Sequence, residues 1–101
     1  MERDGNLTLD DARARVVLEA IRRDRGSSTN NVHMLDWIPE QGEDIFDVLV
    51  DATHVLRIEI ERGTNRETSC EWSTVQNYAK RPLTKPSRRT LEAAIALATD
   101  V

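Results

Sequence analysis

Two residues of types that can act as a nucleophile and its base lie on neighbouring segments of the chain. Cys70 is the only cysteine, and His54 is one of two histidines. Such a pair can serve nucleophilic catalysis or supply half of a metal site. Apolar–polar alternation places both side chains on the apolar face of the predicted strands, where free cysteines are commonly buried. We therefore expect a structural role for both residues, and we expect no enzyme.

Other motifs for catalysis, metals and cofactors are missing. His33 and Asp36 have ligand spacing, but no second pair follows them at the spacing of a metal site. The acidic residues between Asp36 and Asp51 lack the alternating oxygen ligands and central glycine of a calcium loop. No glycine-rich phosphate loop or nucleophile elbow is present. The sequence predicts neither a metal nor a cofactor.

Charge is segregated along the chain, although the formal net charge is only -4. The stretch from Gly26 to Leu56 contains no Lys or Arg and is rich in acidic residues. An acidic surface can imitate nucleic-acid phosphates and occupy a basic groove, and complementary charge speeds encounter. The predicted partner-binding residues are Asp36, Trp37, Glu40, Glu43, Asp44 and Asp47, with Trp37 as an aromatic anchor.

The stretch from Trp72 to Leu91 has the opposite character, because it contains no Asp or Glu. Arg88 and Arg89 fall in the first turn of a predicted helix, where the helix dipole disfavours cations unless an anion is recruited. A tyrosine beside basic residues could also stack on a base. The predicted anion- or nucleic-acid-binding residues are Tyr78, Lys80, Arg81, Lys85, Arg88 and Arg89.

The N-terminal part of the chain predicts an amphipathic helix from about Leu9 to Arg25. Thr8 is placed to cap this helix, and an apolar stripe follows at helical spacing. Gly26 then offers a left-handed stop. A polar linker follows, and residues 32–38 form a short strand or a loop, because their apolar–polar alternation is broken.

The middle of the chain alternates with the period of half-buried strands. A three-residue loop at 51–53 pairs Val50 with His54, Val48 with Leu56 and Phe46 with Ile58. A second loop at 63–65 pairs Ile60 with Thr68, Ile58 with Cys70 and Leu56 with Trp72. One apolar face then crosses three strands. The opposite polar face holds Arg57, Glu59, Glu61, Ser69 and Glu71.

The C-terminal part predicts a second amphipathic helix. Residues 74–80 fit either a strand or a helical turn, and Thr84 or Ser87 caps the final helix. The whole chain, residues 1–101, is then a single α+β domain. We predict a two-layer sandwich of order α-β-β-β-α or α-β-β-β-β-α. Its antiparallel sheet has three or four strands, with both terminal helices packed on one face. The uncovered polar face would meet water or a partner.

Two resemblances bear on the basic segment. The sequence PSRRTLEAAIALA, from Pro86 to Ala98, resembles the closing helix of small helix-turn-helix repressors. The order helix–strands–helix, with basic residues opening the last helix, is similar to the double-stranded-RNA-binding domain, which implies phosphate contacts by Lys85, Arg88 and Arg89. Strand-like residues replace the helices that precede the repressor helix, and the glycine-rich approach and lysine run of the RNA-binding domain are absent.

From these observations we expect a small acidic intracellular binding protein that acts by occupying a macromolecular partner, as inhibitors, immunity proteins and phage antagonists do. One alternative is nucleic-acid or phosphate binding through Tyr78 to Arg89. Another is a homo-oligomeric accessory subunit, most simply a homodimer. The lone cysteine, the lack of a secretory segment and the lack of an apolar span predict a cytoplasmic location without membrane contact.

Overall fold

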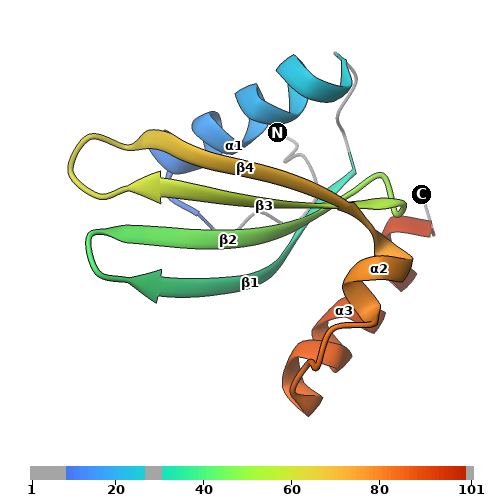
Figure 1. The fold of residues 1–101 in the computed structure, drawn as a ribbon. Coiled ribbons are helices and arrows are strands. Elements are labelled where there is room, and N and C mark those ends of the chain that lie inside the picture. Colours follow the sequence, from blue (N-terminus) through green and yellow to red (C-terminus); the bar gives the residue numbers. More distant parts are fainter. Residues whose placement is uncertain (1–8, 27–30, 100–101) are drawn as a thin grey trace.

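The strands form one antiparallel sheet, and helices precede and follow them in the sequence (Figure 1). The computed structural model describes residues 9–26 and 31–99. The elements are α1 (Asp11–Arg25), β1 (Val32–Glu40), β2 (Glu43–Val50), β3 (His54–Glu61), β4 (Arg66–Thr74), α2 (Val75–Ala79) and α3 (Lys85–Thr99). The strands pair in the order β1-β2-β3-β4. This confirms the predicted α+β class and the order α-β-β-β-β-α, in its four-stranded form.

Helix α1 begins slightly later than its apolar pattern suggests. Its cap is Asp10, whose side chain accepts a hydrogen bond of 2.9 Å from the backbone N–H of Arg13. The predicted cap, Thr8, lies outside the described residues. Gly26 ends the helix at a φ of 100°, in the region that favours glycine, and its N–H donates to Arg22. The C-terminal end of α1 is therefore the glycine stop that the sequence predicts.

The predicted register of β2 and β3 is confirmed. Val50 lies opposite His54, and Val48 lies opposite Leu56. The three-residue loop places Asp51 and Ala52 at φ values of 55° and 61°. This tight connection keeps the apolar side chains of both strands on one face.

The register of β3 and β4 is confirmed except near the turn. Ile58 lies opposite Cys70, but Ile60 lies opposite Glu67 rather than Thr68. A bulge at Thr68 absorbs one residue, so the loop spans residues 62–65 instead of the predicted 63–65. Asn65 is left-handed, with a φ of 56°, and its N–H donates to Glu61. The last pair before the loop is therefore Glu61 with Arg66, whereas the predicted loop would pair Arg62 with Arg66.

The segments that the sequence left undecided are also settled. Residues 32–38 belong to the nine-residue strand β1, which carries a bulge between Met34 and Asp36. Residues after Thr74 form the short helix α2, because the Thr74 hydroxyl accepts from the N–H of Asn77. Thr84 caps α3 in the same way, accepting from Ser87.

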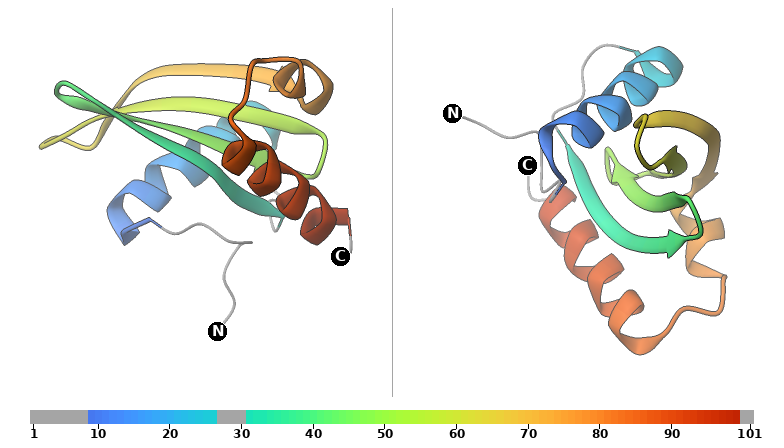
Figure 2. Two further views of the ribbon diagram at one scale, coloured as in Figure 1. Left: turned by 90° about the horizontal axis from the view of Figure 1, so that it is seen from below. Right: turned by 90° about the vertical axis from the view of Figure 1, so that its left-hand side faces the viewer.

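The helices lie on opposite faces of the sheet, and this corrects the expectation that both pack on one face (Figure 2). Helix α1 covers the face that carries Phe46, Val48 and Leu56. Helix α3 packs through Leu91, Ala94 and Ala98 against the other face. That second face is apolar at one end because Leu35, Leu49 and Val55 alternate with the residues of the first core. The sheet is therefore sandwiched between two layers of helix at that end.

Candidate interaction surface

Helices α2 and α3 cover only one end of their face of the sheet (Figures 1 and 2). The end nearer the β1–β2 and β3–β4 turns carries no helix (Figure 1). We name this region the open face. Strand pairing places on it Asp36, Ile38, Glu40, Glu43, Ile45, Arg57, Glu59, Glu61, Arg66, Ser69 and Glu71. None of these residues is fully buried.

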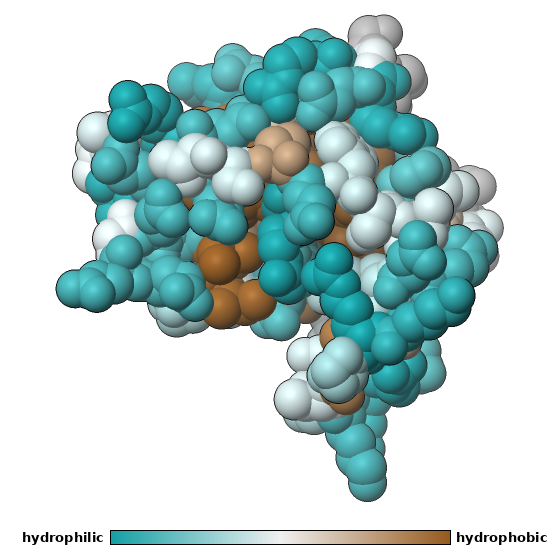
Figure 3. Space-filling view, in the orientation of Figure 1, coloured by the Kyte–Doolittle hydropathy of each residue, from teal (hydrophilic) through white to brown (hydrophobic). Residues whose placement is uncertain are grey.

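The centre of the open face is apolar and its surroundings are polar. Ile38 lies directly opposite Ile45 on the neighbouring strand, and both side chains are only half-buried. Figure 3 shows a small apolar patch over β1 and β2, surrounded by hydrophilic side chains. An apolar centre inside a polar rim is the usual anatomy of a protein–protein interface. The open face therefore has the composition of a surface that another macromolecule covers.

The charge of the open face is predominantly negative. Its two cationic side chains already form ion pairs, since Arg57 pairs with Asp47 and Arg66 pairs with Glu61 at 3.3 Å. None of the ion pairs within the described residues involves Asp36, Glu40, Glu43, Glu59 or Glu71. The face therefore offers carboxylates that no cation of residues 9–26 and 31–99 pairs with.

Two of these carboxylates repel each other. Glu43 lies opposite Glu61 and Ile45 lies opposite Glu59, so Glu43 and Glu59 are diagonal neighbours on one face. Partial burial and the interaction with Glu43 raise the pKa of Glu59 above its ordinary value. The only hydrogen bond that Glu43 accepts from a described side chain is 2.8 Å long and comes from the hydroxyl of Thr68. A cation placed between the two carboxylates would relieve this repulsion.

The predicted partner-binding residue Asp44 has a structural role instead. Its side chain faces α1 and is 1% exposed. It pairs with Arg13 at 2.9 Å and Arg62 at 3.0 Å, and it accepts the indole N–H of Trp37 at 3.0 Å. These contacts, led by the bond from Arg62, hold the pKa of Asp44 below its ordinary value. A partner cannot reach this carboxylate in the folded chain.

Asp47 is equally inaccessible. Its contacts also bury Tyr78, which was predicted to bind an anion or a nucleic acid. The guanidinium of Arg57 donates to both of its oxygens, at 2.8 and 2.9 Å. The hydroxyl of Tyr78 donates to Asp47 at 2.9 Å, and Tyr78 is itself buried. Burial and the adjacent carboxylate raise the pKa of that hydroxyl. Tyr78 therefore anchors α2 to the sheet and has no free ring face to stack on a base.

The predicted anchor Trp37 is exposed, but it does not belong to the open face. It pairs with Phe46 and shares the α1 side of the sheet, whereas Asp36 and Glu40 lie on the other side. Its side chain is 57% exposed and borders a pocket of about 210 Å³ that includes Leu9 and Arg13. The predicted site is therefore divided between two faces at the edge strand.

The predicted basic residues gather where α3 projects away from the sheet (Figure 1). Lys85, Arg88 and Arg89 occupy the first turns of α3 and are exposed, as is Lys80. Arg81 lies over the ring of Tyr78, with its guanidinium carbon 5.4 Å from the ring centroid. In the described part of the chain, these basic side chains form no ion pair with a carboxylate.

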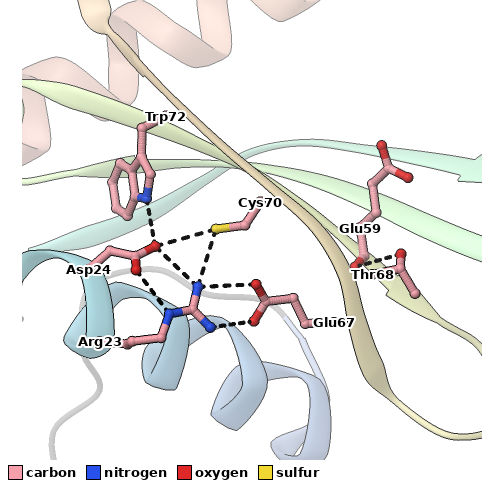
Figure 4. A network of polar contacts seen from close by, with 7 residues as sticks. All are labelled: Arg23, Asp24, Glu59, Glu67, Thr68, Cys70 and Trp72. Atoms are coloured by element: carbon pink, nitrogen blue, oxygen red, sulfur yellow. Dashed lines mark hydrogen bonds and ion pairs between the residues drawn. The ribbon is translucent and has the colours of Figure 1, made fainter.

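His54 and Cys70 lie on the same face, as predicted, but they do not form a pair. Their positions are four residues apart along the β3–β4 ladder, or about 13 Å. The Cys70 sulfur joins a network with Asp24 and Arg23 at the end of α1 (Figure 4). Partial burial raises the pKa of the thiol to about 11, so it stays protonated near neutral pH. His54 instead contacts the hydroxyl of Thr53 at 2.9 Å.

The same network connects α1 to the edge strand β4. Arg23 bridges Asp24 and Glu67, and the indole N–H of Trp72 donates to Asp24 at 2.9 Å (Figure 4). The guanidinium of Arg25 lies 5.5 Å from the centroid of the Trp72 ring. Apart from the Arg23–Asp24 pair, which lies within α1, each of these contacts attaches the helix to the sheet, so the network has a structural explanation.

Comparison of the chain with known proteins gives no match to a family model, to a curated protein or to a solved structure. Over residues 9–26 and 31–99, no group of three or more His, Cys, Asp or Glu side chains is placed to hold a metal ion. No helix in these ranges is long and apolar enough to cross a membrane.

Sequence reasoning missed part of the open face. Glu59, Glu61 and Glu71 lie on the polar side of the predicted strands, but they are distant in sequence from the acidic stretch before Asp51. The predicted register was the available signal, because it brings Glu61 opposite Glu43. Ile38 could not be assigned to this face, since the bulge in β1 changes which side it faces, whereas Ile45 follows from the predicted register, which sets it opposite Glu59.

Proposed function

We propose that this protein is a non-catalytic binding protein whose open face occupies a basic surface of a macromolecular partner. The observation that carries the proposal is a partly exposed Ile38–Ile45 pair among carboxylates that form no ion pair with a cation of the described residues. Charge would guide the encounter, and burial of the apolar centre would hold the complex. The role is that of an inhibitor, immunity protein or antagonist in the cytoplasm, where a lone thiol stays reduced.

The repulsion between Glu43 and Glu59 supports a partner that presents lysine or arginine. A cation between the two carboxylates would lower the raised pKa of Glu59. Binding would then release a proton near that pKa. Affinity should fall as the pH drops through the pKa of Glu59, because the protonated acid no longer attracts the cation.

The test is affinity capture from a lysate of the source cell, with nuclease treatment and elution by a salt step. We expect one stoichiometric protein that survives nuclease and elutes as salt rises. A variant with Glu40→Gln, Glu43→Gln and Glu59→Gln should no longer capture this protein. The matched control, Glu19→Gln with Asp51→Asn and Glu92→Gln, removes three exposed carboxylates elsewhere and should retain it. Equal capture by both variants would contradict the proposal.

A second candidate is nucleic-acid or phosphate binding through the start of α3. The observation in its favour is that Lys85, Arg88 and Arg89 are exposed together without an ion pair in the described residues. Fluorescence anisotropy with duplex and single-stranded oligonucleotides at low salt measures this directly. Binding that Arg88→Glu with Arg89→Glu abolishes would support it, and no binding by the wild-type chain would remove it.

A further inference from the structure

The two tryptophans of the sheet share one arrangement. Each belongs to an edge strand, Trp37 to β1 and Trp72 to β4, and both lie on the α1 side. The indole N–H of Trp37 donates to Asp44 at 3.0 Å, and that of Trp72 donates to Asp24 at 2.9 Å, as Figure 4 shows. Because the only donor of each ring is satisfied, another group would meet the apolar, electron-rich ring surface.

The two rings differ in what covers them. The guanidinium carbon of Arg25 lies 5.5 Å from the centroid of the Trp72 ring, and that of Arg81 lies 5.4 Å from the centroid of Tyr78. No cationic side chain of the described residues lies over the ring of Trp37, which is 57% exposed. Trp37 therefore repeats the arrangement of Trp72 without its arginine.

A pocket of about 210 Å³ adjoins the uncovered ring. Its other lining residues are Leu9, Asp10, Arg13, Met34 and Phe46. The aliphatic stem of an arginine packs on apolar surface while its charged end stays near water. The pocket thus offers apolar side chains for such a stem and an aromatic ring for its guanidinium.

The charges around the ring favour a cation over an anion. The carboxylates belong to Asp10 in the lining, to Asp36, which accepts from the backbone N–H of the tryptophan at 2.9 Å, and to Asp44. The guanidiniums of Arg13 and Arg62 are both held by Asp44, at 2.9 and 3.0 Å. Asp10 is 64% exposed, and its contact with Arg13 is longer, at 3.7 Å. Carboxylates outnumber guanidiniums in this group, so it attracts positive charge.

We propose that the ring of Trp37 receives an arginine side chain from a partner protein. The guanidinium would lie over this ring as Arg25 lies over Trp72, and the carboxylate of Asp10 would attract it. Arginine fits better than lysine, because its planar and weakly hydrated guanidinium stacks on aromatic rings. The site lies on the α1 side of β1, so the inference goes beyond the open face and does not depend on the proposed function.

The test compares N-acetyl-arginine amide with its citrulline analogue, in which a neutral urea of similar shape replaces the guanidinium. The full chain, labelled with ¹⁵N, is titrated with each compound at constant ionic strength, and the indole N–H resonances are followed. We expect the arginine compound to bind at Trp37 about fivefold more tightly than the citrulline compound. The resonance of Trp72 should move much less, because Arg25 already covers that ring. Equal affinities at Trp37, or no response to either compound, would overturn the proposal.

Three variants test the roles of charge and of the uncovered ring. Asp10→Asn keeps a side chain that caps helices but removes the charge, so it should weaken binding of the arginine compound about twofold and leave the citrulline compound unaffected. The control Glu92→Gln removes an exposed carboxylate of α3 and should change neither. Arg25→Ala uncovers Trp72, whose resonance should then respond to the arginine compound as that of Trp37 does. A Trp72 resonance that still does not respond would contradict the parallel on which the proposal rests.

Adenosine tests whether the ring instead prefers a nucleobase, because it is planar and uncharged and can stack on tryptophan. We expect it to bind at Trp37 more weakly than the arginine compound. Binding of adenosine that is equally tight, and unchanged by Asp10→Asn, would overturn the proposal in favour of a nucleic-acid partner.

Discussion

Glu43 and Asp47 lie four residues apart on strand β2 and point to the same face of the sheet, yet their surroundings are opposite. Asp47 is fully buried and receives hydrogen bonds from Arg57 and Tyr78. Glu43 lies beyond the covered end, where Glu59 is its neighbour and no cation of the described chain pairs with it. One acidic stretch therefore supplies both a structural ion pair and a free surface charge.

The difference shows what decides the role of a carboxylate in this fold. Where α2 and α3 cover the sheet, a charge is retained only with full pairing, because an unpaired buried charge is very costly. Where the sheet is open, water solvates the charge and no partner is required. Acidic residues of equal formal charge should therefore respond in opposite ways to neutralisation.

The largest effect is expected from Asp47→Ala. Removal of this carboxylate leaves the buried hydroxyl of Tyr78 without its acceptor and Arg57 without its partner. The free energy of unfolding should fall by about 3 kcal/mol, the lower end for breaking a buried pair, because Arg57 is partly exposed. Urea denaturation measures this. Glu43→Ala on the same strand is the control, with a change within about 0.5 kcal/mol. Similar losses in both variants would break the comparison.

The next effect is expected from Asp44→Asn. The free energy of unfolding should fall by about 2 kcal/mol at neutral pH, because charge-assisted hydrogen bonds become neutral ones. The folded pKa of Asp44 is lowered, so its stabilisation is present above the ordinary pKa and is lost as the pH falls through the lowered value. The difference between wild type and variant should therefore shrink in acid. Urea midpoints at neutral and acidic pH test this, and a constant difference would argue against it.

Glu43→Gln should act in the opposite direction. Removal of one of two repelling carboxylates should stabilise the chain by a few tenths of a kcal/mol at neutral pH. The folded pKa of Glu59 is raised, so its ionisation lowers stability as the pH rises through that value. The gain should therefore disappear in acid. Carboxyl NMR should show the pKa of Glu59 moving down in the variant. An unchanged pKa would mean that burial alone raises it.

The smallest effect is expected from Arg66→Ala. Its side chain is 73% exposed and its bond to Glu61 is 3.3 Å long. Exposed pairs contribute little, so the free energy of unfolding should change by less than about 0.5 kcal/mol. The same urea experiment suffices. A loss comparable to that of Asp47→Ala would show that exposure does not control the strength of ion pairs on this sheet.

Most of the fold was predictable from sequence periodicity, because α1, β2 and β3 have clear helical or alternating patterns. The register of β2 and β3 was also predictable, and it sets Asp47 opposite Arg57, which signals that ion pair. The opposite placement of the helices was not predictable from the same patterns. It depends on a few apolar residues, such as Leu49 and Val55, at positions that otherwise read as polar.

The candidate surface was less predictable than the fold, because burial depends on contacts between distant residues. Asp44 owes its burial to Arg13 and Arg62, which lie 31 and 18 residues away in sequence. The bulges at Leu35 and Thr68 leave no clear mark in the sequence beyond interrupted alternation. One extra residue is enough to move a side chain to the other face.

The bulge in β1 makes this strand two half-strands in opposite phase. Val32 and Met34 belong to the α1 side in the first half, whereas in the second half Trp37 takes that side and Ile38 joins the open face. Deletion of Leu35 would remove the bulge while both halves keep their sides, because Met34 and Asp36 already pair with the consecutive residues Val48 and Asp47. Trp37 would stay on the α1 side and Ile38 on the open face, but the core beneath α3 would lose an apolar side chain. The extra residue therefore lets this edge strand add to the core beneath α3 without changing the surface that it presents further along.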